Sequence, residues 1–388
     1  MPVYLDNSAT TRVCTEAAQK MLDVMQNHFG NPSSLHTMGL DAERILLQAR
    51  ESVATALSAV PAELVFTSGG TEANNLAVFG AARALRRRGN RIVTTAIEHP
   101  SVQNAMRALE QEGFEVIRLA PGADGAVRED DLFAAVTKET VLVSMMLVNN
   151  ETGAIQPVSA AKRAVTRAGS PALVHCDTVQ GFMKIPFRPE RLGVDLATIS
   201  AHKIHGPKGA GALYIRKGAR VLPTLFGGGQ EKGLRPGTEP LPAIAGFGEA
   251  ARVAQARFDE TAAHTRALRG YCIRSLSALP DAVFNPDTLG ALSAEEDARL
   301  YAPHILNVSI PGIRSETMLH FLEAKGIFVS SGSACSKGAT SPVLASMGLS
   351  PARIDSAIRV SFCRDNTKED AKALVDALSL GAASLMRK

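Results

Sequence analysis

Residues 196–209 read LATISAHKIHGPKG, and the interpretation of the whole chain starts from this stretch. The apolar run Leu196–Ile199 predicts a buried strand, and a polar turn follows it. Lys203 lies in that turn, with His202 before it and His205 after it. Burial and neighbouring cations lower the pKa of a lysine, and a neutral lysine can form a Schiff base with a carbonyl group. Taken alone, the segment fits a solvated turn with incidental charges equally well.

Apolar runs of strand length alternate with helix-period segments around this stretch. The predicted strands before residue 216 are Glu63–Thr67, Arg91–Thr95, Glu115–Leu119, Val141–Val148, Leu173–Asp177, Leu196–Ser200 and Gly211–Ile215. Several are continuously apolar, which is typical of strands buried on both faces of a mainly parallel sheet. Helical periodicity between them, as at Ile45, Ala49, Val53 and Leu57, predicts a three-layer α/β domain.

The pattern changes near residue 240. A helical stripe formed by Ile244, Phe247, Ala251, Ala254 and Phe258 predicts a long helix that leaves the first domain. Fewer strands follow, at Ile305–Ile310, Ile327–Ser330 and Ala357–Ser361, and Thr367 with Asp370 predicts a capping box for the last helix. We expect a large domain over residues 15–261, and a smaller α+β domain made of residues 1–14 and 262–388.

Composition excludes several classes of protein. The chain has 388 residues and a net charge of +4, which suits two globular domains and argues against nucleic-acid binding. No apolar stretch approaches the roughly 20 residues that span a bilayer, and no signal peptide is visible. The cysteines are Cys14, Cys176, Cys272, Cys335 and Cys363. They form no Cys-x-x-Cys pair, so we expect no disulfide framework, no metal site and a cytoplasmic setting.

Polar residues follow three of the predicted strands. Ser68–Ala73 is glycine-rich and precedes a helix, which outlines a phosphate site, although a plain strand-to-helix turn fits as well. Asp177 ends its strand, where a carboxylate could hold a protonated pyridine nitrogen. His99 also lies at a strand end, where an imidazole could stack on a ring and move protons; a helix cap is the alternative.

Two further residues carry chemistry late in the chain. Cys335 lies in the polar loop Ser330–Gly338 beside Lys337, where a thiol can be partly thiolate and nucleophilic, so we favour a functional over a structural role. Arg359 lies inside an apolar strand and needs a partner. A substrate carboxylate and a structural ion pair are equally compatible with that position.

The motifs run nearly from end to end of the chain. They are Tyr4–Thr11, Gly30–His36, Thr67–Glu72, Glu98–His99, Val148–Gly153, Asp177–Gln180, Ser200–Lys203, Arg235–Thr238, the loop of Cys335, and Arg359–Ser361. Together and in this order they resemble the cysteine desulfurases of the iron–sulfur-cluster and nitrogenase-maturation type. These enzymes belong to the class V aminotransferase group, which uses pyridoxal 5′-phosphate (PLP), so the resemblance implies a PLP-dependent transferase fold of type I.

The resemblance implies a role for each site residue. Lys203 would carry PLP as a Schiff base and move the substrate's Cα proton, His99 would stack on the ring, and Cys335 would take sulfur from L-cysteine as a persulfide, leaving L-alanine. The other implied cofactor contacts are Gly70, Thr71, Asp177, Gln180, Ser200, His202 and, on the phosphate of the partner in a homodimer, Thr238. Asn150 and Arg359 would bind the substrate carboxylate. A sulfur-acceptor protein, such as an iron–sulfur scaffold or a sulfur carrier, would receive the sulfur.

Some alternatives stay open. A selenocysteine lyase or a transaminase of the same fold is an alternative, although a transaminase has no need of Cys335. A sulfur-relay or scaffold-binding protein with a degenerate site is disfavoured, because no proposed catalytic position is substituted. The loop after Cys335 looks about two residues shorter than the common cluster-assembly form, which leaves the sulfur acceptor open. Cys363 stands where the family often has a small residue, and we interpret it as packing.

Overall fold

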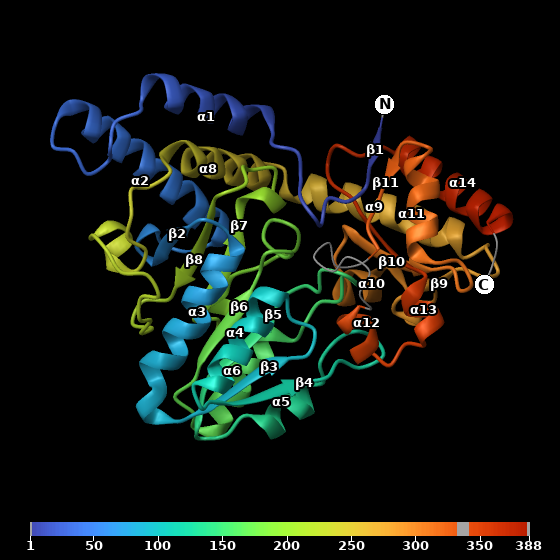
Figure 1. The fold of residues 1–388 in the computed structure, drawn as a ribbon, viewed down its shortest axis with the longest axis horizontal. Helices are drawn as coiled ribbons and strands as arrows, with labels where there is room; N and C mark the ends of the chain where they lie inside the picture. Colours follow the sequence, from blue (N-terminus) through green and yellow to red (C-terminus); the bar gives the residue numbers. More distant parts are fainter. Residues whose placement is uncertain (1, 332–340, 386–388) are drawn as a thin grey trace.

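The computed structural model describes residues 2–331 and 341–385 (Figure 1). The helices are α1 Thr15–Asn27, α2 Thr37–Leu57, α3 Gly70–Leu85, α4 Pro100–Gln111, α5 Glu129–Ala135, α6 Val158–Ala168, α7 Pro189–Leu192, α8 Leu241–Ala256, α9 Phe258–Leu276, α10 Ala294–Leu300, α11 Ser315–Glu323, α12 Pro342–Ser346, α13 Pro351–Asp355 and α14 Lys368–Ser384. The strands are β1 Val3–Tyr4, β2 Leu64–Thr67, β3 Arg91–Thr95, β4 Glu115–Leu119, β5 Thr140–Met146, β6 Leu173–Asp177, β7 Leu196–Ser200, β8 Gly211–Ile215, β9 Val283–Phe284, β10 Ile305–Ser309, β11 Ile327–Phe328 and β12 Ala357–Ser361.

A seven-stranded sheet forms the centre of the larger region, in the order β2-β8-β7-β6-β5-β3-β4. Parallel pairing joins β7, β6, β5, β3 and β4. Only β8 runs the other way, pairing antiparallel with both β7 and β2. The prediction of a mainly parallel α/β sheet is therefore confirmed, with β8 as the exception.

Apolar side chains on both faces of this sheet explain its three layers. On one face, Val65, Ile92, Leu142, Leu173, Leu196 and Leu213 pack with the buried sides of α3 and α4. Their chain neighbours Phe66, Val93, Val143, Val174, Ala197 and Ala212 pack on the other face with residues of α2, α5, α6 and α8. Successive side chains of a strand point to opposite faces, so continuously apolar strands must be covered by helices on both sides.

The parallel strands place their carboxyl ends at one edge of the sheet. Thr67, Thr95, Met146, Asp177 and Ser200 end β2, β3, β5, β6 and β7. Ligands of open α/β sheets bind beyond this edge, because the loops and helix N-termini there are free to contact them. The predicted site residues follow these same strand ends, so the sheet brings them together.

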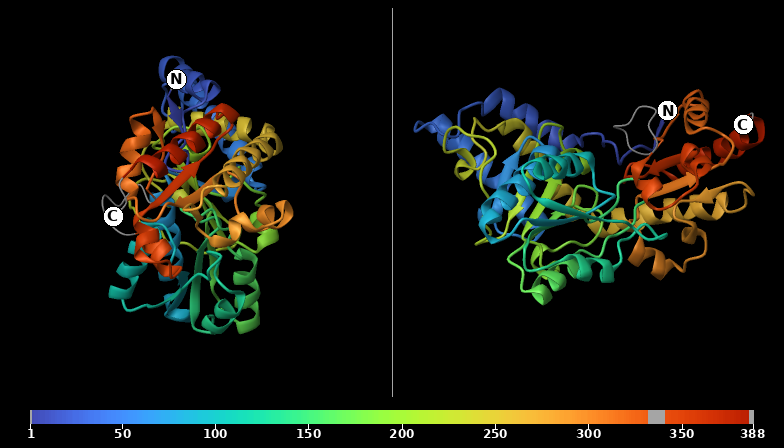
Figure 2. Two further views of the ribbon diagram at one scale, coloured as in Figure 1. Left: turned by 90° about the vertical axis from the view of Figure 1, so that its right-hand side faces the viewer. Right: turned by 60° about the horizontal axis from the view of Figure 1, so that its bottom comes forward.

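A smaller region packs against the larger one, drawn in orange and red (Figures 1 and 2). Its antiparallel sheet has the order β12-β10-β9, and the N-terminal β1 pairs with β11. Leu5 accordingly belongs to a second core with residues of α9, α11 and α14. The predicted domain limits, residues 15–261 against 1–14 and 262–388, stay a prediction. No helix among residues 2–331 and 341–385 is long and apolar enough to cross a membrane.

The sequence prediction of one long helix near residue 240 is wrong in detail. The helix is interrupted at Arg257, whose φ of −112° and ψ of 17° are not helical. The stripe from Ile244 to Ala254 therefore belongs to α8, and α9 begins afresh at Phe258.

The capping box of the last helix is confirmed, since Thr367 accepts from the Asp370 N–H and Asp370 accepts from the Thr367 N–H.

Candidate active site

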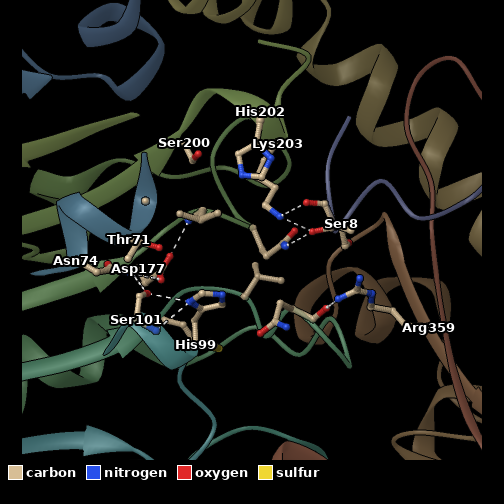
Figure 3. Close-up of a pocket in the computed structure, with 17 residues that line it drawn as sticks. Ser8, Thr71, Asn74, His99, Ser101, Asp177, Ser200, His202, Lys203 and Arg359 are labelled. Atoms are coloured by element: carbon tan, nitrogen blue, oxygen red, sulfur yellow. Dashed lines mark hydrogen bonds between the residues drawn. The ribbon is translucent and has the colours of Figure 1, made fainter. Parts of the chain in front are cut away.

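A cavity of about 290 Å³ opens at the carboxyl edge of the large sheet. Among its lining residues are ten that the sequence predicted: Gly70, Thr71, His99, Asn150, Asp177, Gln180, Ser200, His202, Lys203 and Arg359. They come from β6, β7, the 3₁₀ turn Ala201–Lys203, the start of α3, three loops and the distant β12. In Figure 3, Lys203 and Asp177 approach the cavity from one side and Arg359 from the other. The fold therefore gathers these residues around a single cavity.

Lys203 is held by the N-terminal segment. Its Nζ donates to the carbonyl oxygens of Ser8 at 2.6 Å and Ala9 at 2.7 Å (Figure 3). Burial, followed by the positive charge of Arg359, lowers the pKa of Lys203 to about 8. A lysine with this pKa has an appreciable neutral fraction near neutral pH and can act as a nucleophile. The sequence prediction assigned no role to Ser8 and Ala9, although they lie in the Tyr4–Thr11 motif.

Asp177 is fixed by two donors. Its Oδ2 accepts from Asn74 Nδ2 at 2.8 Å, and its Oδ1 accepts from the Val179 N–H at 3.0 Å. Asn74 was missed in the sequence, but a signal was present. It follows Thr71 by three residues in α3, and residues at this spacing share one face of a helix.

His99 caps α4 and lines the cavity at the same time, so the helix-cap alternative describes only part of its role. Its Nδ1 accepts from the Ser101 N–H at 3.2 Å, which leaves the proton of the neutral ring on Nε2. Burial, opposed by Asp177 and assisted by Lys203, lowers the pKa of His99. The ring is therefore favoured in its neutral form as a packing surface and Nε2 donor.

Glu98 is a buried acid that the sequence prediction left without a role. Its Oε1 accepts from Thr95 Oγ1 at 2.7 Å and from the Met146 N–H at 2.8 Å, which joins the ends of β3 and β5. Burial raises the pKa of Glu98 to about 8, so its carboxyl group is mostly neutral at pH 7. This contact holds the strand end from which His99 projects.

The start of α3 provides the predicted phosphate side of the cavity. Gly70 begins this helix, and a Cβ there would lie 3.0 Å from Val179 Cγ2, so a side chain would crowd the turn. Opposite it, Ser200 Oγ is buried and has no hydrogen-bond partner among the described residues. Burial and two lysines lower the pKa of His202 to about 4, so its ring is neutral. Free helix N–H groups with such side chains suit an anion.

These features fit PLP. The free hydroxyl of Ser200 and the N-terminus of α3 would hold its phosphate, Asp177 its pyridine nitrogen, and Lys203 its carbonyl carbon. Gln180 is already oriented, because its Nε2 donates to the Ser8 carbonyl at 2.9 Å.

Arg359 closes the cavity from the smaller region. Its Nη2 bonds Asp6 Oδ1 at 2.9 Å and its Nη1 donates to the Asn150 carbonyl at 3.0 Å. Its Nε is buried without a hydrogen-bond partner in the described part of the chain. The structural ion pair is therefore confirmed, and Arg359 also lines the cavity, while its contact with a substrate carboxylate stays a prediction.

One predicted residue in the described part of the chain does not line this cavity. Thr238 is exposed and does not line it. Cys335 lies outside the described residues.

Cys363 is buried, and Cys363, His205 and Asp365 bring three potential ligand atoms within 4.8 Å of one another among the described residues. Burial and the cations Lys184 and Arg364 lower the pKa of His205 to about 4. Because two cations already act on this group, it is a poor place for a metal ion. No metal role is assigned to it.

Comparison with known proteins identifies the relatives of this chain. The sequence profile of the family described as Aminotransferase class-V matches residues 3–374. A cysteine desulfurase of Trichormus azollae is 38% identical over 379 residues, covering 97% of this chain and 92% of that protein. The cysteine desulfurase IscS of Vibrio vulnificus is 39% identical over 392 residues, covering 99% and 94%. A solved NifS-like protein superposes with a TM-score of 0.91 at 38% identity, covering 99% of this chain and all of that one.

Proposed function

Because this chain belongs to the class V aminotransferase family, we propose that it is a PLP-dependent L-cysteine desulfurase. The observation that carries the proposal is the buried Lys203 amine in a cavity that also holds Asp177 and Arg359. A lysine with a lowered pKa, an acid for a ring nitrogen and a cation for a substrate carboxylate are the groups that amino-acid chemistry on PLP requires.

The substrate would be held from the side of the smaller region. Arg359 and Asn150 both line the cavity, and Arg359 Nε has no hydrogen-bond partner among the described residues, so both side chains would bind the carboxylate of L-cysteine. A charge-assisted bond to a guanidinium orients a carboxylate strongly, which fixes the Cα–H bond relative to Lys203.

The proton steps would fall to Lys203. Once its amine is free, the lowered pKa lets it accept the Cα proton and return one to the product near neutral pH. When bound, PLP would supply an electron-poor ring that withdraws electrons from the substrate Cα, and the Asp177 carboxylate would keep its ring nitrogen protonated. The neutral His99 ring would pack on the cofactor and keep water away from this face.

Cys335 would receive the sulfur. The Cβ–S bond of L-cysteine breaks and a bond forms between that sulfur and the Cys335 sulfur. In the net reaction the thiol hydrogen of Cys335 ends on the former Cβ carbon. The products are L-alanine and a persulfide on Cys335, and no external oxidant or reductant is consumed. The persulfide would pass to an iron–sulfur scaffold or another sulfur acceptor, as the family relation suggests.

A homodimer and a cytoplasmic setting belong to the same proposal. Large apolar side chains are exposed on α1, on α2 and on a nearby loop, including Leu35 at 97% and Phe226 at 88% exposure. The yellow stretch that carries Phe226 lies beside α2 in Figures 1 and 2, so one partner could cover both. Thr238 is exposed on the same stretch, which suits its proposed contact with the phosphate of the partner. A reducing compartment would keep the Cys335 thiol free.

The test is sulfur transfer by the purified protein loaded with PLP. Wild type given L-cysteine should form L-alanine and a Cys335 persulfide, measured by chromatography and by alkylation with mass spectrometry. Cys335→Ala should stop sulfur transfer while the yellow colour of the bound cofactor remains. Cys363→Ala is the control, because Cys363 is a free cysteine that lies outside the cavity.

Sulfur transfer at the wild-type rate by Cys335→Ala would contradict the proposal. Transfer of the amino group to a keto acid by that variant would favour a transaminase instead.

A further inference from the structure

Cys335 belongs to residues 332–340, which we call the Cys335 stretch. The described residues on either side of it, Ser330 and Ser341, form hydrogen bonds close to Asn150 and Arg359. On one side, Ser330 and Arg359 exchange two backbone hydrogen bonds, of 3.1 and 2.7 Å. On the other side, Ser341 Oγ bonds Glu151 Oε2 at 2.6 Å. Glu151 follows Asn150, whose carbonyl is bonded by Arg359. Ser330 is therefore bonded to Arg359 itself, and Ser341 is bonded to Glu151, the neighbour of Asn150.

Glu151 is held firmly enough to act as an anchor. Its side chain is buried, its N–H donates to Asn149 Oδ1 at 2.9 Å, and its carbonyl accepts from Asn307 Nδ2 at 3.2 Å. Burial raises the pKa of Glu151, while Ser341 and Arg359 oppose this. A buried carboxyl group without a hydrogen-bond partner destabilises the folded state. The hydrogen bond from the Ser341 hydroxyl to Glu151 therefore stabilises the fold.

Ser341 connects Glu151 to helix α12. Its hydroxyl accepts from the Leu344 N–H at 3.1 Å and so caps α12 while its own proton is directed to Glu151. Leu344 and Val343 pack in an apolar cluster with Ile97 and Met146. Ile97 lies two residues before His99, and Met146 lines the cavity. The helix after Ser341 is thus fixed to the wall of the cavity itself.

We propose that Glu151 is a positioning residue for sulfur transfer, which fixes the end of the Cys335 stretch relative to Asn150 and Arg359 by holding Ser341. This inference rests on the proposed desulfurase function. Cys335 precedes Ser341 by six residues, so covalent geometry keeps it within about 20 Å of this anchor. Because a group-transfer rate depends on how the reacting groups are oriented, loosening the anchor at Ser341 would slow the transfer of sulfur to Cys335.

The experiment compares Ser341→Ala, Glu151→Ala, Glu151→Gln and the double alanine variant in the PLP-loaded protein. Binding of L-cysteine is read from the change in the visible spectrum, and persulfide formation on Cys335 from quenched alkylation and mass spectrometry. We expect both single alanine variants to form persulfide about tenfold more slowly, the scale of one lost hydrogen bond to a charged or buried group. Their KM for L-cysteine should change little, so the loss appears in kcat.

Two controls separate positioning from simple destabilisation. Glu151→Gln keeps a group that can bond Ser341 and should recover most of the rate. Ser346→Ala removes another hydroxyl bond of α12, to the Val343 carbonyl at 2.8 Å, and should leave persulfide formation unchanged. The double alanine variant should be no slower than either single variant, because the two residues act through one contact.

Each contrary outcome has a distinct meaning. Wild-type persulfide rates in Ser341→Ala and Glu151→Ala, an equal loss in Ser346→Ala, or losses that multiply in the double variant would overturn this inference alone. A wild-type protein that forms no alanine from L-cysteine would overturn the proposed function, and this inference with it.

Discussion

The two walls of the cavity are built in different ways. The first wall consists of Asp177, His99, Ser200 and Lys203, which all lie at or just after strand ends of a single sheet. The second wall consists of Asn150 and Arg359, and Asp6, which lies 353 residues before Arg359 and does not line the cavity, holds Arg359 through an ion pair. The first wall is organised by one sheet edge and the second by the packing of the smaller region on the larger.

This difference separates cofactor binding from substrate binding. The backbones of Asp177 and Ser200 are fixed by the hydrogen bonds of β6 and β7, which do not involve the second wall. Arg359 keeps its position only while β12, the N-terminal segment and Asn150 stay together. We therefore expect damage to the first wall to abolish cofactor chemistry, and damage to the second to weaken substrate binding while the cofactor stays.

The largest effect is expected for Lys203→Ala. Loss of the amine removes both the covalent attachment and the proposed proton transfer, so alanine formation should fall by about 10³-fold or more, the scale of general acid–base catalysis. The visible spectrum should lose the lysine-bound cofactor. Lys184→Met is the control, because burial also lowers the pKa of Lys184 but this lysine lies outside the cavity. A normal cofactor spectrum in Lys203→Ala would break the assignment of the first wall.

Asp177→Asn should have the next largest effect. The amide keeps the shape of the side chain but loses the negative charge opposite the ring nitrogen. Removing one partner of a buried charge pair costs about 3–5 kcal/mol, so kcat should fall by about 10²–10³-fold. Steady-state kinetics with the cofactor content measured in parallel checks this. Asp195→Asn tests the opposite edge of the sheet, where Asp195 pairs with Arg216, and should reduce stability rather than kcat.

Arg359→Lys tests the second wall. A lysine retains the charge but not the planar fork that reaches Asp6, Asn150 and the cavity together. One lost charge-assisted bond is worth about 1.5–3 kcal/mol, so KM for L-cysteine should rise by about 10- to 150-fold with the cofactor spectrum unchanged. Arg314→Lys, in an exposed pair with Asp355, is the control. An unchanged KM would refute the division of labour between the walls.

The smallest expected effect is a change in the pKa of Lys203 on the first wall when the charge of Arg359 on the second wall is removed. In the cofactor-free chain, competitive acetylation should show Lys203 half-reactive at a pH of about 8, below the ordinary lysine pKa of 10.5. Arg359→Gln should raise this pKa, because the Arg359 charge lowers it. The unfolded chain binds more protons than the folded chain between pH 8 and 10.5. Lys203 therefore makes the free energy of unfolding rise with pH across that window. No change in Arg359→Gln would mean that the walls are electrostatically independent.

Local patterns determined most of the first wall. The apolar runs before Asp177 and Ser200 predicted strands whose bounds agree with the structure, and the glycine-rich turn Ser68–Gly70 predicted the start of a helix, which is α3. These predictions succeed because a strand end and a helix start are local features, set by a few residues. Local pattern failed where a single helix was expected, because the break at Arg257 depends on how α8 and α9 pack on different regions.

What the sequence by itself determined is the chemistry available at one sheet edge: a lysine, an acid, an imidazole and a glycine-rich helix start, each next to an apolar run. Only the tertiary structure decided the rest. It brought Ser8 and Ala9 to Lys203, Asn74 to Asp177, Glu151 to Ser341, and Asp6 to Arg359. These contacts join segments far apart in the chain, and their energies depend on burial and distance, which sequence periodicity does not encode.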